Sequence, residues 1–172
     1  MIGRWMGPLI AAVLVAAVGY YATLALTPQL LMRSAWNRVA TDGANAFAFP
    51  SLATDQSRAI VRPSPDLAYA SCPFDVSDKP LLVEVPPVPS AYWSLSVFDA
   101  ETNVAFVKNN ADSRGGTIKL AIALPAVPTP AGYERVVVNS PRGIALVRIL
   151  VEDRATFPAI DAARQKASCR LG

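Results

Sequence analysis

The sequence predicts a mainly β fold: an antiparallel β-sandwich or barrel-like domain with an N-terminal transmembrane helix and a C-terminal helix. Three observations indicate it: short stretches in which apolar and polar residues alternate, an uncharged apolar run near the start, and clusters of proline between the stretches. Alternation with a period of two turns one face of each strand toward a core. Proline cannot donate a ladder hydrogen bond, so its clusters mark strand ends and edges.

The first segment is apolar throughout. Between Trp5 and Leu26 there are 22 residues and no charge. As a helix they rise about 33 Å, enough to cross a hydrocarbon core of roughly 30 Å. We therefore expect residues 1–26 to be a transmembrane or signal-anchor helix that contacts the lipid bilayer through residues 5–26. The alternative is a secretory signal cleaved after Thr23-Leu24-Ala25.

Residues 27–56 are expected to hold a second helix and a connecting loop. Thr27 and Pro28 are typical of a helix start, as N-cap and first helical residue. Gly43 suits the C-terminal cap of that helix. Beyond it no clear period appears until the β-rich domain, which we place at residues 57–172.

Several strands follow from the alternation. The expected strands cover Leu81–Val85, Tyr92–Phe98 and Ile118–Leu124. Val136–Asn139 and Ile144–Val151 are expected to form a hairpin, and Gly115-Gly116 is interpreted as another hairpin turn. A last helix is expected to start at Thr156, as its cap, and to end before Cys169.

The two cysteines are far apart in the sequence. Cys72 and Cys169 are separated by 97 residues, which fits neither a zinc site with close ligand pairs nor a Cys-x-x-Cys redox motif. A structural disulfide is favoured over two free buried thiols. It would remove unfolded-state entropy worth about 4–5 kcal/mol in the chain-entropy model.

The expected location follows from the cysteines. Disulfides persist in oxidising compartments such as the bacterial periplasm. The positive-inside rule does not favour export, because Arg4 precedes the apolar run while Arg33 and Arg38 follow it. Following the cysteines, we expect a single-pass protein of the bacterial inner membrane with its β domain in the periplasm.

Charge and histidine content limit the function. The formal net charge is +3 and the chain has no histidine. Its basic residues form no stripe, so no nucleic acid partner is expected. Histidine is the side chain most often used for proton transfer near neutral pH and a common metal ligand. Its absence, and the lack of recognisable catalytic, phosphate or dinucleotide motifs, favours a non-enzymatic protein with no cofactor and no metal.

One group of candidate binding residues lies in a proline-rich turn. Arg62 and Asp66 flank Pro63-Ser64-Pro65, and Tyr69 follows. Arg62 and Asp66 are expected to meet across the turn as a charge-assisted pair, which beside Tyr69 would suit a carboxylate or a sugar. The alternative is that the pair only stabilises the turn.

A second group surrounds the expected strand Tyr92–Phe98. Asp99 and Asn103 follow the strand, where Asp99 is also typical of a turn former. Tyr92 and Trp93 point to opposite faces, so one of them is expected to line a pocket or interface. Together the two groups give the candidate ligand or partner sites: Arg62, Asp66, Tyr69, Tyr92, Asp99 and Asn103.

These residues also carry a family resemblance. The motif Arg62-Pro63-Ser64-Pro65-Asp66-Leu67-Ala68-Tyr69, the later run Tyr92–Asp99 with Thr102-Asn103, the helix segment Ala35–Val39 and the two cysteines resemble the domain of unknown function 1254 family. The resemblance covers roughly residues 20–170 and is strongest with short membrane-anchored bacterial members. In long members this domain is fused to a second β-rich domain of the 1214 family. The resemblance therefore implies a separately encoded partner of that second family.

The leading hypothesis is a membrane-anchored periplasmic β domain that acts as a binding or assembly partner of another envelope protein. The alternative is a periplasmic enzyme or ligand carrier that acts on envelope lipid or carbohydrate with Asp and Arg side chains. A purely structural envelope component is the third option.

Overall fold

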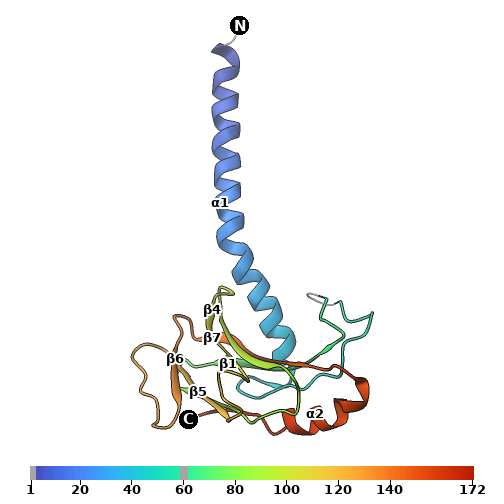
Figure 1. The fold of residues 1–172 in the computed structure, drawn as a ribbon. Coiled ribbons are helices and arrows are strands. Elements are labelled where there is room, and N and C mark those ends of the chain that lie inside the picture. Colours follow the sequence, from blue (N-terminus) through green and yellow to red (C-terminus); the bar gives the residue numbers. More distant parts are fainter. Residues whose placement is uncertain (1–2, 59–61) are drawn as a thin grey trace.

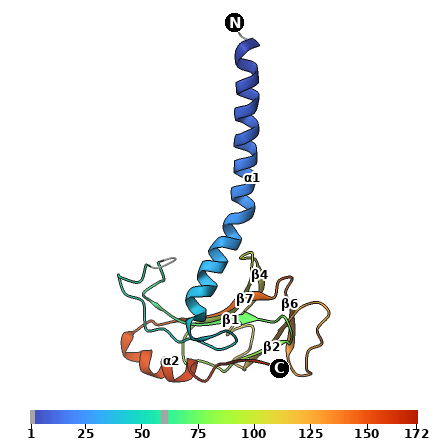
Figure 2. The same ribbon diagram turned by 180° about the vertical axis from the view of Figure 1, so that it is seen from behind.

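The computed structural model describes residues 3–58 and 62–172. Residues 1–2 of the expected anchor and residues 59–61 of the expected β domain lie outside the described part. In the described chain, a long N-terminal helix projects from a β domain (Figure 1). The C-terminus lies in that domain, on the side away from the helix (Figure 2).

Eight described strands form two four-stranded sheets. Sheet A has the order β1-β7-β3-β4 and sheet B the order β6-β5-β2-β8. The strands are β1 (Leu67–Asp75), β2 (Leu81–Val85), β3 (Trp93–Asp99), β4 (Val104–Asn109), β5 (Ile118–Ala123), β6 (Glu134–Val137), β7 (Arg142–Leu150) and β8 (Ser168–Leu171). All described pairs are antiparallel except β5 with β6, which is parallel. The two open sheets confirm the sandwich form of the expected fold.

Alternating residues of both sheets fill the core. The largest fully buried side chains include Phe74, Trp93, Leu95 and Ile149 from sheet A and Leu81, Val83, Leu120 and Ile122 from sheet B. Each contributes about 1.5–3 kcal/mol by leaving water. Between the sheets, the expected disulfide joins Cys72 of β1 to Cys169 of β8, with 6.5 Å between their Cα atoms. The disulfide therefore fastens sheet A to sheet B.

Two expected hairpins are wrong. β6 and β7 lie in different sheets, so the chain crosses the sandwich between them instead of turning back. In the same way Gly115-Gly116 lies in the connection from β4 in sheet A to β5 in sheet B. Alternation identifies strands, but it does not determine which strands pair.

The N-terminal helix α1 (Gly3–Val39) is continuous, so the expected restart at Thr27 is wrong. The Thr27 Oγ1 atom does not cap a new helix; it donates to the Thr23 carbonyl at 2.6 Å. Pro28 lies inside the helix, and proline inside a helix is the usual cause of a bend such as the one visible above the domain in Figure 2. A 3₁₀ turn, η1 (Ala40–Asp42), follows and ends at Gly43 with φ 110°.

The expected C-terminal helix is present as α2 (Phe157–Arg164), preceded by the 3₁₀ turn η2 (Arg154–Thr156). Thr156 makes no side-chain cap bond; the carboxylate of Asp153 accepts from the Ala155 N–H at 2.9 Å instead. The chain then enters β8, a strand that the alternation of apolar and polar residues does not predict.

Candidate functional site

The base of α1 packs on the outer face of sheet A, the face turned away from the core. The Trp36 indole N–H donates to the Phe74 carbonyl at 3.2 Å. The Arg142 guanidinium lies over the Trp36 ring, 5.1 Å from its centre, and its Nε pairs with Asp75 Oδ2 at 2.9 Å. Trp36 and Arg142 therefore fix the helix to β1 and β7.

The pKa of Asp75 lies below its usual value. Burial raises this pKa, but hydrogen bonds from Ser77 and Arg142, with the charge of Arg142, together outweigh the burial. The carboxylate also forms a turn, because its Oδ1 accepts from the Ser77 N–H at 3.1 Å. Asp75 is thus an ionised anchor for Arg142 and not a proton donor at neutral pH.

A groove lies beside the helix base, between α1, the loop before β1, and sheet A. We call it the α1 groove; its volume is about 550 Å³. Most of its lining is apolar and comes from Met32, Ala35 and Val39 of α1, Pro50, Ala53 and Pro63 of the loop, and Phe98, Ile144 and Leu146 of the strands. Arg38 is the one charged residue among the described lining residues. A second, more polar cavity of about 330 Å³ lies beside Gln29, Arg33 and Asn37 of the same helix.

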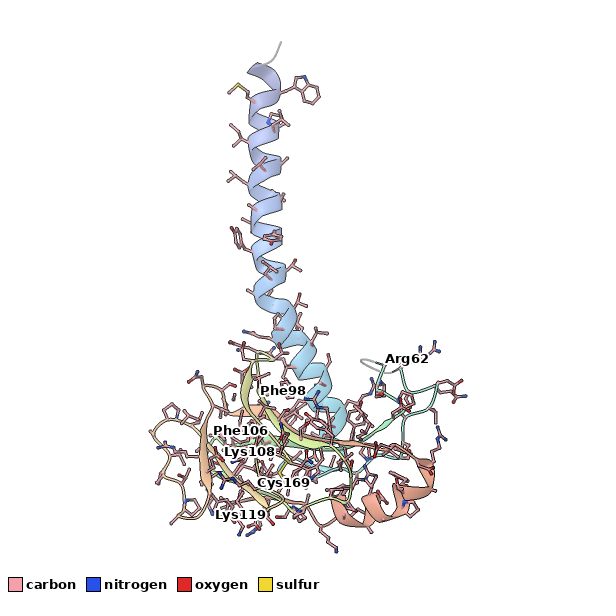
Figure 3. The ribbon with its side chains drawn as sticks, in the orientation of Figure 1. Arg62, Phe98, Phe106, Lys108, Lys119 and Cys169 are labelled. Carbon is pink, nitrogen blue, oxygen red and sulfur yellow. A yellow bond between two sulfur atoms is a disulfide. The ribbon has the colours of Figure 1, made fainter. Side chains whose placement is uncertain are left out.

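Of the first group of expected site residues, Tyr69 lies in the α1 groove, and Arg62 and Asp66 lie in the turn beside it. Tyr69 lines it, and its hydroxyl accepts from the Ser64 N–H at 3.1 Å. Arg62 is exposed and directly precedes Pro63 at the groove; Figure 3 shows Arg62 on the side of the domain from which α1 leaves. Asp66 is also exposed, and its N–H lies 3.4 Å from Ser64 Oγ.

The Arg62–Asp66 pair is not formed in the described structure, where neither side chain makes an ion pair. The sequence predicts an ion pair between these two side chains that stabilises the turn. Instead, the Asp66 carbonyl accepts from the Val151 N–H at 2.8 Å, so the backbone holds the turn.

The second group does not converge on the α1 groove. Asp99 forms a turn: its Oδ1 accepts from the Glu101 and Asn103 N–H groups, and its Oδ2 accepts from the Asn103 side-chain amide at 3.0 Å. Tyr92 is 46% exposed at the opposite end of β3, while Trp93 is buried in the core. The expected residues therefore divide among the groove, a turn and an exposed strand end.

Some buried polar groups on sheet A were missed by sequence reasoning. Ser94 and Ser96 alternate with core residues along β3, a pattern that predicts a solvent-facing side, yet both are fully buried. Arg148 is paired across the sheet with Ser94 and reaches Ser96 Oγ at 3.3 Å. The Ser94 hydroxyl and the Arg148 Nε have no hydrogen-bond partner in the described chain. The serines at alternate positions of β3 were the sequence feature that could have indicated a buried polar face.

A charged cluster covers the outer face of sheet B. The Tyr133 hydroxyl donates to Glu84, which Lys119 and Arg170 approach at 3.8 and 4.0 Å. The hydrogen bond from Tyr133 lowers the pKa of Glu84, helped by the charges of Lys119 and Arg170 despite some burial. The same bond raises the pKa of Tyr133. Glu84 is therefore ionised at neutral pH, and neither it nor Tyr133 is poised to exchange a proton there.

A known protein family matches most of the chain. A family model described as "Protein of unknown function (DUF1254)" matches residues 44–170. This chain belongs to that family. The sequence resemblance is thereby confirmed, and no protein with a curated description matches the chain.

The DUF1254 domain also resembles solved structures at low identity. The VPA0106 protein from Vibrio parahaemolyticus superposes with a TM-score of 0.68 at 15% identity, over 87% of this chain and 37% of that one. An uncharacterised protein from Burkholderia cenocepacia gives a TM-score of 0.50 at 17% identity, over 89% and 42%. These similarities show the fold. The chain spans 37–42% of the length of these two proteins.

The described residues of the DUF1254 domain hold two carboxylates with shifted pKa values and one largely apolar groove. In the described residues, no three Asp, Glu or Cys side chains are grouped to hold a metal ion. The carboxylates with shifted pKa values, Asp75 and Glu84, are both shifted toward the charged form. The α1 groove has apolar walls, one arginine and a tyrosine hydroxyl. This combination is typical of ligand sites.

Proposed function

We propose that this protein is a DUF1254 domain anchored in the bacterial inner membrane by α1, with its β domain in the periplasm, and that it binds another envelope protein. The observation that carries the proposal is the edge strand β4, which is uncovered in the described structure and exposes more than half of Val104 and Val107. The proposed partner is a protein of the 1214 family, as the family resemblance implies.

The anchor is supported by the surface of α1. The helix is long and apolar enough to cross a membrane. Large apolar side chains such as Leu9, Val13 and Val18 are each more than 60% exposed along it. Leaving such a stripe in water is unfavourable by about 25 cal/mol per Å², so a bilayer is its natural environment.

The edge strand β4 offers a surface for the partner. The other edge of sheet A, β1, is covered by the preceding loop, because Ala48 and Ser71 exchange two backbone hydrogen bonds of 2.8 and 3.1 Å. β4 has no such cover in the described structure, and Val104 and Val107 on it are 58% and 59% exposed. An uncovered edge strand can pair with a strand of another protein.

The backbone of Val107 makes this edge testable. In an antiparallel pair, residues alternate between pointing their N–H toward the partner strand and away from it. The Asn110 N–H donates to the Trp93 carbonyl at 3.0 Å, and Val107 pairs with Ser96. Val107 therefore points its N–H away from β3, toward the open edge. Proline at this position removes one outward donor and leaves the β3 pairing intact.

The test is co-purification from detergent-solubilised native membranes with a tag at the C-terminus. The wild-type protein is expected to bring down a second envelope protein. Val107→Pro should lower its yield at least about fivefold, because one edge hydrogen bond is lost and the strand approach is blocked. Val107→Thr keeps the N–H and the branched side chain and should retain the partner. A wild-type protein that is repeatedly purified without a second protein would contradict the proposal. Equal yields of the partner with Val107→Pro and Val107→Thr would contradict β4 as the surface that binds it.

A further inference from the structure

The α1 groove continues the surface of the membrane helix. Met32, Ala35 and Val39 form one of its walls, and they belong to the same unbroken helix as the expected span. The opposite wall is the outer face of sheet A, with Phe98, Ile144 and Leu146. The position of the groove relative to the bilayer is therefore set by the helix itself.

The length of the uncharged run brings the groove close to the bilayer. From Trp5 to Met32 there are 28 residues without a charge. They rise about 42 Å as a helix, roughly 12 Å more than a hydrocarbon core of about 30 Å. The excess apolar turns include Leu30 and Leu31, which are more than half exposed. Met32 ends the run and begins the groove, so lipid that covers these turns also meets the groove entrance.

The described lining of the groove carries one positive charge, and Asp66 is exposed in the nearby turn. Arg38 is the one charged residue among the described lining residues, and Arg62 lies next to Pro63 at the rim. Both arginines are exposed. A guanidinium binds a phosphate through two parallel hydrogen bonds. The apolar walls suit a hydrocarbon chain, and a volume of about 550 Å³ lies in the usual range of small-molecule sites.

We propose that the α1 groove binds a phospholipid of the membrane that α1 spans, with an acyl chain between the helix and sheet A and the phosphate at Arg38. This inference rests on the proposed insertion of α1 into the membrane. It adds a lipid ligand to the protein partner of the proposed function. No β4 residue is among the described groove residues, but the two surfaces adjoin where Phe98 of the groove pairs with Val104 of β4.

The test is photocrosslinking of the full-length protein in nanodiscs. The probe is phosphatidylglycerol with a diazirine in one acyl chain, and crosslinked sites are mapped by mass spectrometry of peptides. The proposal predicts crosslinks at Phe98, Ile144 or Leu146 in addition to those along the span. Ala35→Trp fills the groove and should lower the groove crosslinks at least about fivefold, with span crosslinks unchanged. Ala16→Trp, the same substitution within the span, should leave the groove crosslinks intact.

A second arm tests the headgroup. Arg38→Gln should reduce the preference of the groove for phosphatidylglycerol over phosphatidylcholine by about fivefold, the effect of about 1 kcal/mol per basic residue near an anionic surface. Arg154→Gln, an exposed arginine in the turn before α2, is the matched control and should change nothing. Equal loss of preference in both variants would overturn the assignment of the phosphate to Arg38.

The failures are distinguishable. Crosslinks along the span with none in the groove would overturn the lipid site and leave the anchor in place. Absence of crosslinks from both would overturn the insertion of α1 as well. Groove crosslinks that persist in Ala35→Trp, or a protein captured there in native membranes by a photoreactive residue at Leu146, would also contradict lipid as the occupant.

Discussion

Arg164 is the buried side chain that joins three parts of the domain. It is 3% exposed. Its Nε donates to Asp161 at 2.6 Å, while its other nitrogens donate to the carbonyls of Pro50, at 2.8 Å, and Tyr69. The guanidinium thus connects α2 to β1 and to the loop that forms one wall of the α1 groove.

Arg164→Met should lower the free energy of unfolding by about 3 kcal/mol, because two carbonyls lose a charged donor and the Asp161 carboxylate loses its partner. Chemical denaturation of the full chain in detergent micelles measures this. Arg154→Met, on an exposed residue, is the control and should cost less than about 0.5 kcal/mol. Equal stability of the two variants would contradict the joining role of Arg164.

The lowered pKa of Asp75 gives stability a definite pH dependence. Because the folded pKa lies below the unfolded one, the contribution is complete above the unfolded pKa of about 4 and is lost as the pH falls through the folded pKa. Asp75→Asn should therefore destabilise the protein at pH 7, with a difference from wild type that shrinks below about pH 4. The measurement is denaturant unfolding of both proteins across that range. A difference that stays constant down to pH 3 would refute the role of the charge.

At the scale of elements, the disulfide is a cross-link that joins sheet A to sheet B in addition to the backbone connections. Cys72→Ser combined with Cys169→Ser should lower the free energy of unfolding by about 4 kcal/mol, since the closed loop contains 97 residues. Hydrogen exchange should rise first in β8, which is the last strand at an edge of sheet B. Reductant should reproduce the loss in the wild type and have no effect on the double variant. An unchanged unfolding midpoint after reduction would show that the bond contributes little.

The strands show what sequence could predict. β2, β3 and β5 were placed to within one residue, because alternating apolar residues mark strands with one buried face. β1, β4 and β8 were missed. β4 and β8 are edge strands that are mostly exposed or half-exposed and carry little alternation, and β1 contains Pro73, a residue that argues against a strand. The predicted helix restart is wrong because α1 runs through Thr27 and Pro28 without ending; a Thr-Pro pair is typical of a helix start but is also tolerated inside a long helix.

The candidate site was harder to predict than the strands. Tyr69 was found through a motif around a proline-rich turn. The α1 groove itself draws on Met32, on a loop, and on Leu146 more than a hundred residues later. No local spacing links such residues; they meet because α1 lies across the outer face of sheet A. Arg148 and Arg164 were missed for the same reason, since Ser96, which Arg148 contacts, and Pro50 and Tyr69, which Arg164 contacts, lie far away in the sequence.

At the scale of the whole molecule, the helix and the outer face of sheet A belong to one arrangement. α1 leaves the domain from that face (Figures 1 and 2). If α1 spans the inner membrane, the α1 groove faces the bilayer, while α2 and the C-terminus lie on the far side. The proposed periplasmic placement rests on the disulfide, because disulfides persist in oxidising compartments.

The measurement that tests this most directly is a pair of reporters fused after Gly172 in the native host, alkaline phosphatase in one strain and green fluorescent protein in the other. Alkaline phosphatase folds only where its disulfides form, and green fluorescent protein exported unfolded through the membrane stays dark. The account predicts an active phosphatase and a dark fluorescent protein. A bright fluorescent protein with an inactive phosphatase would place the domain in the cytosol and contradict it.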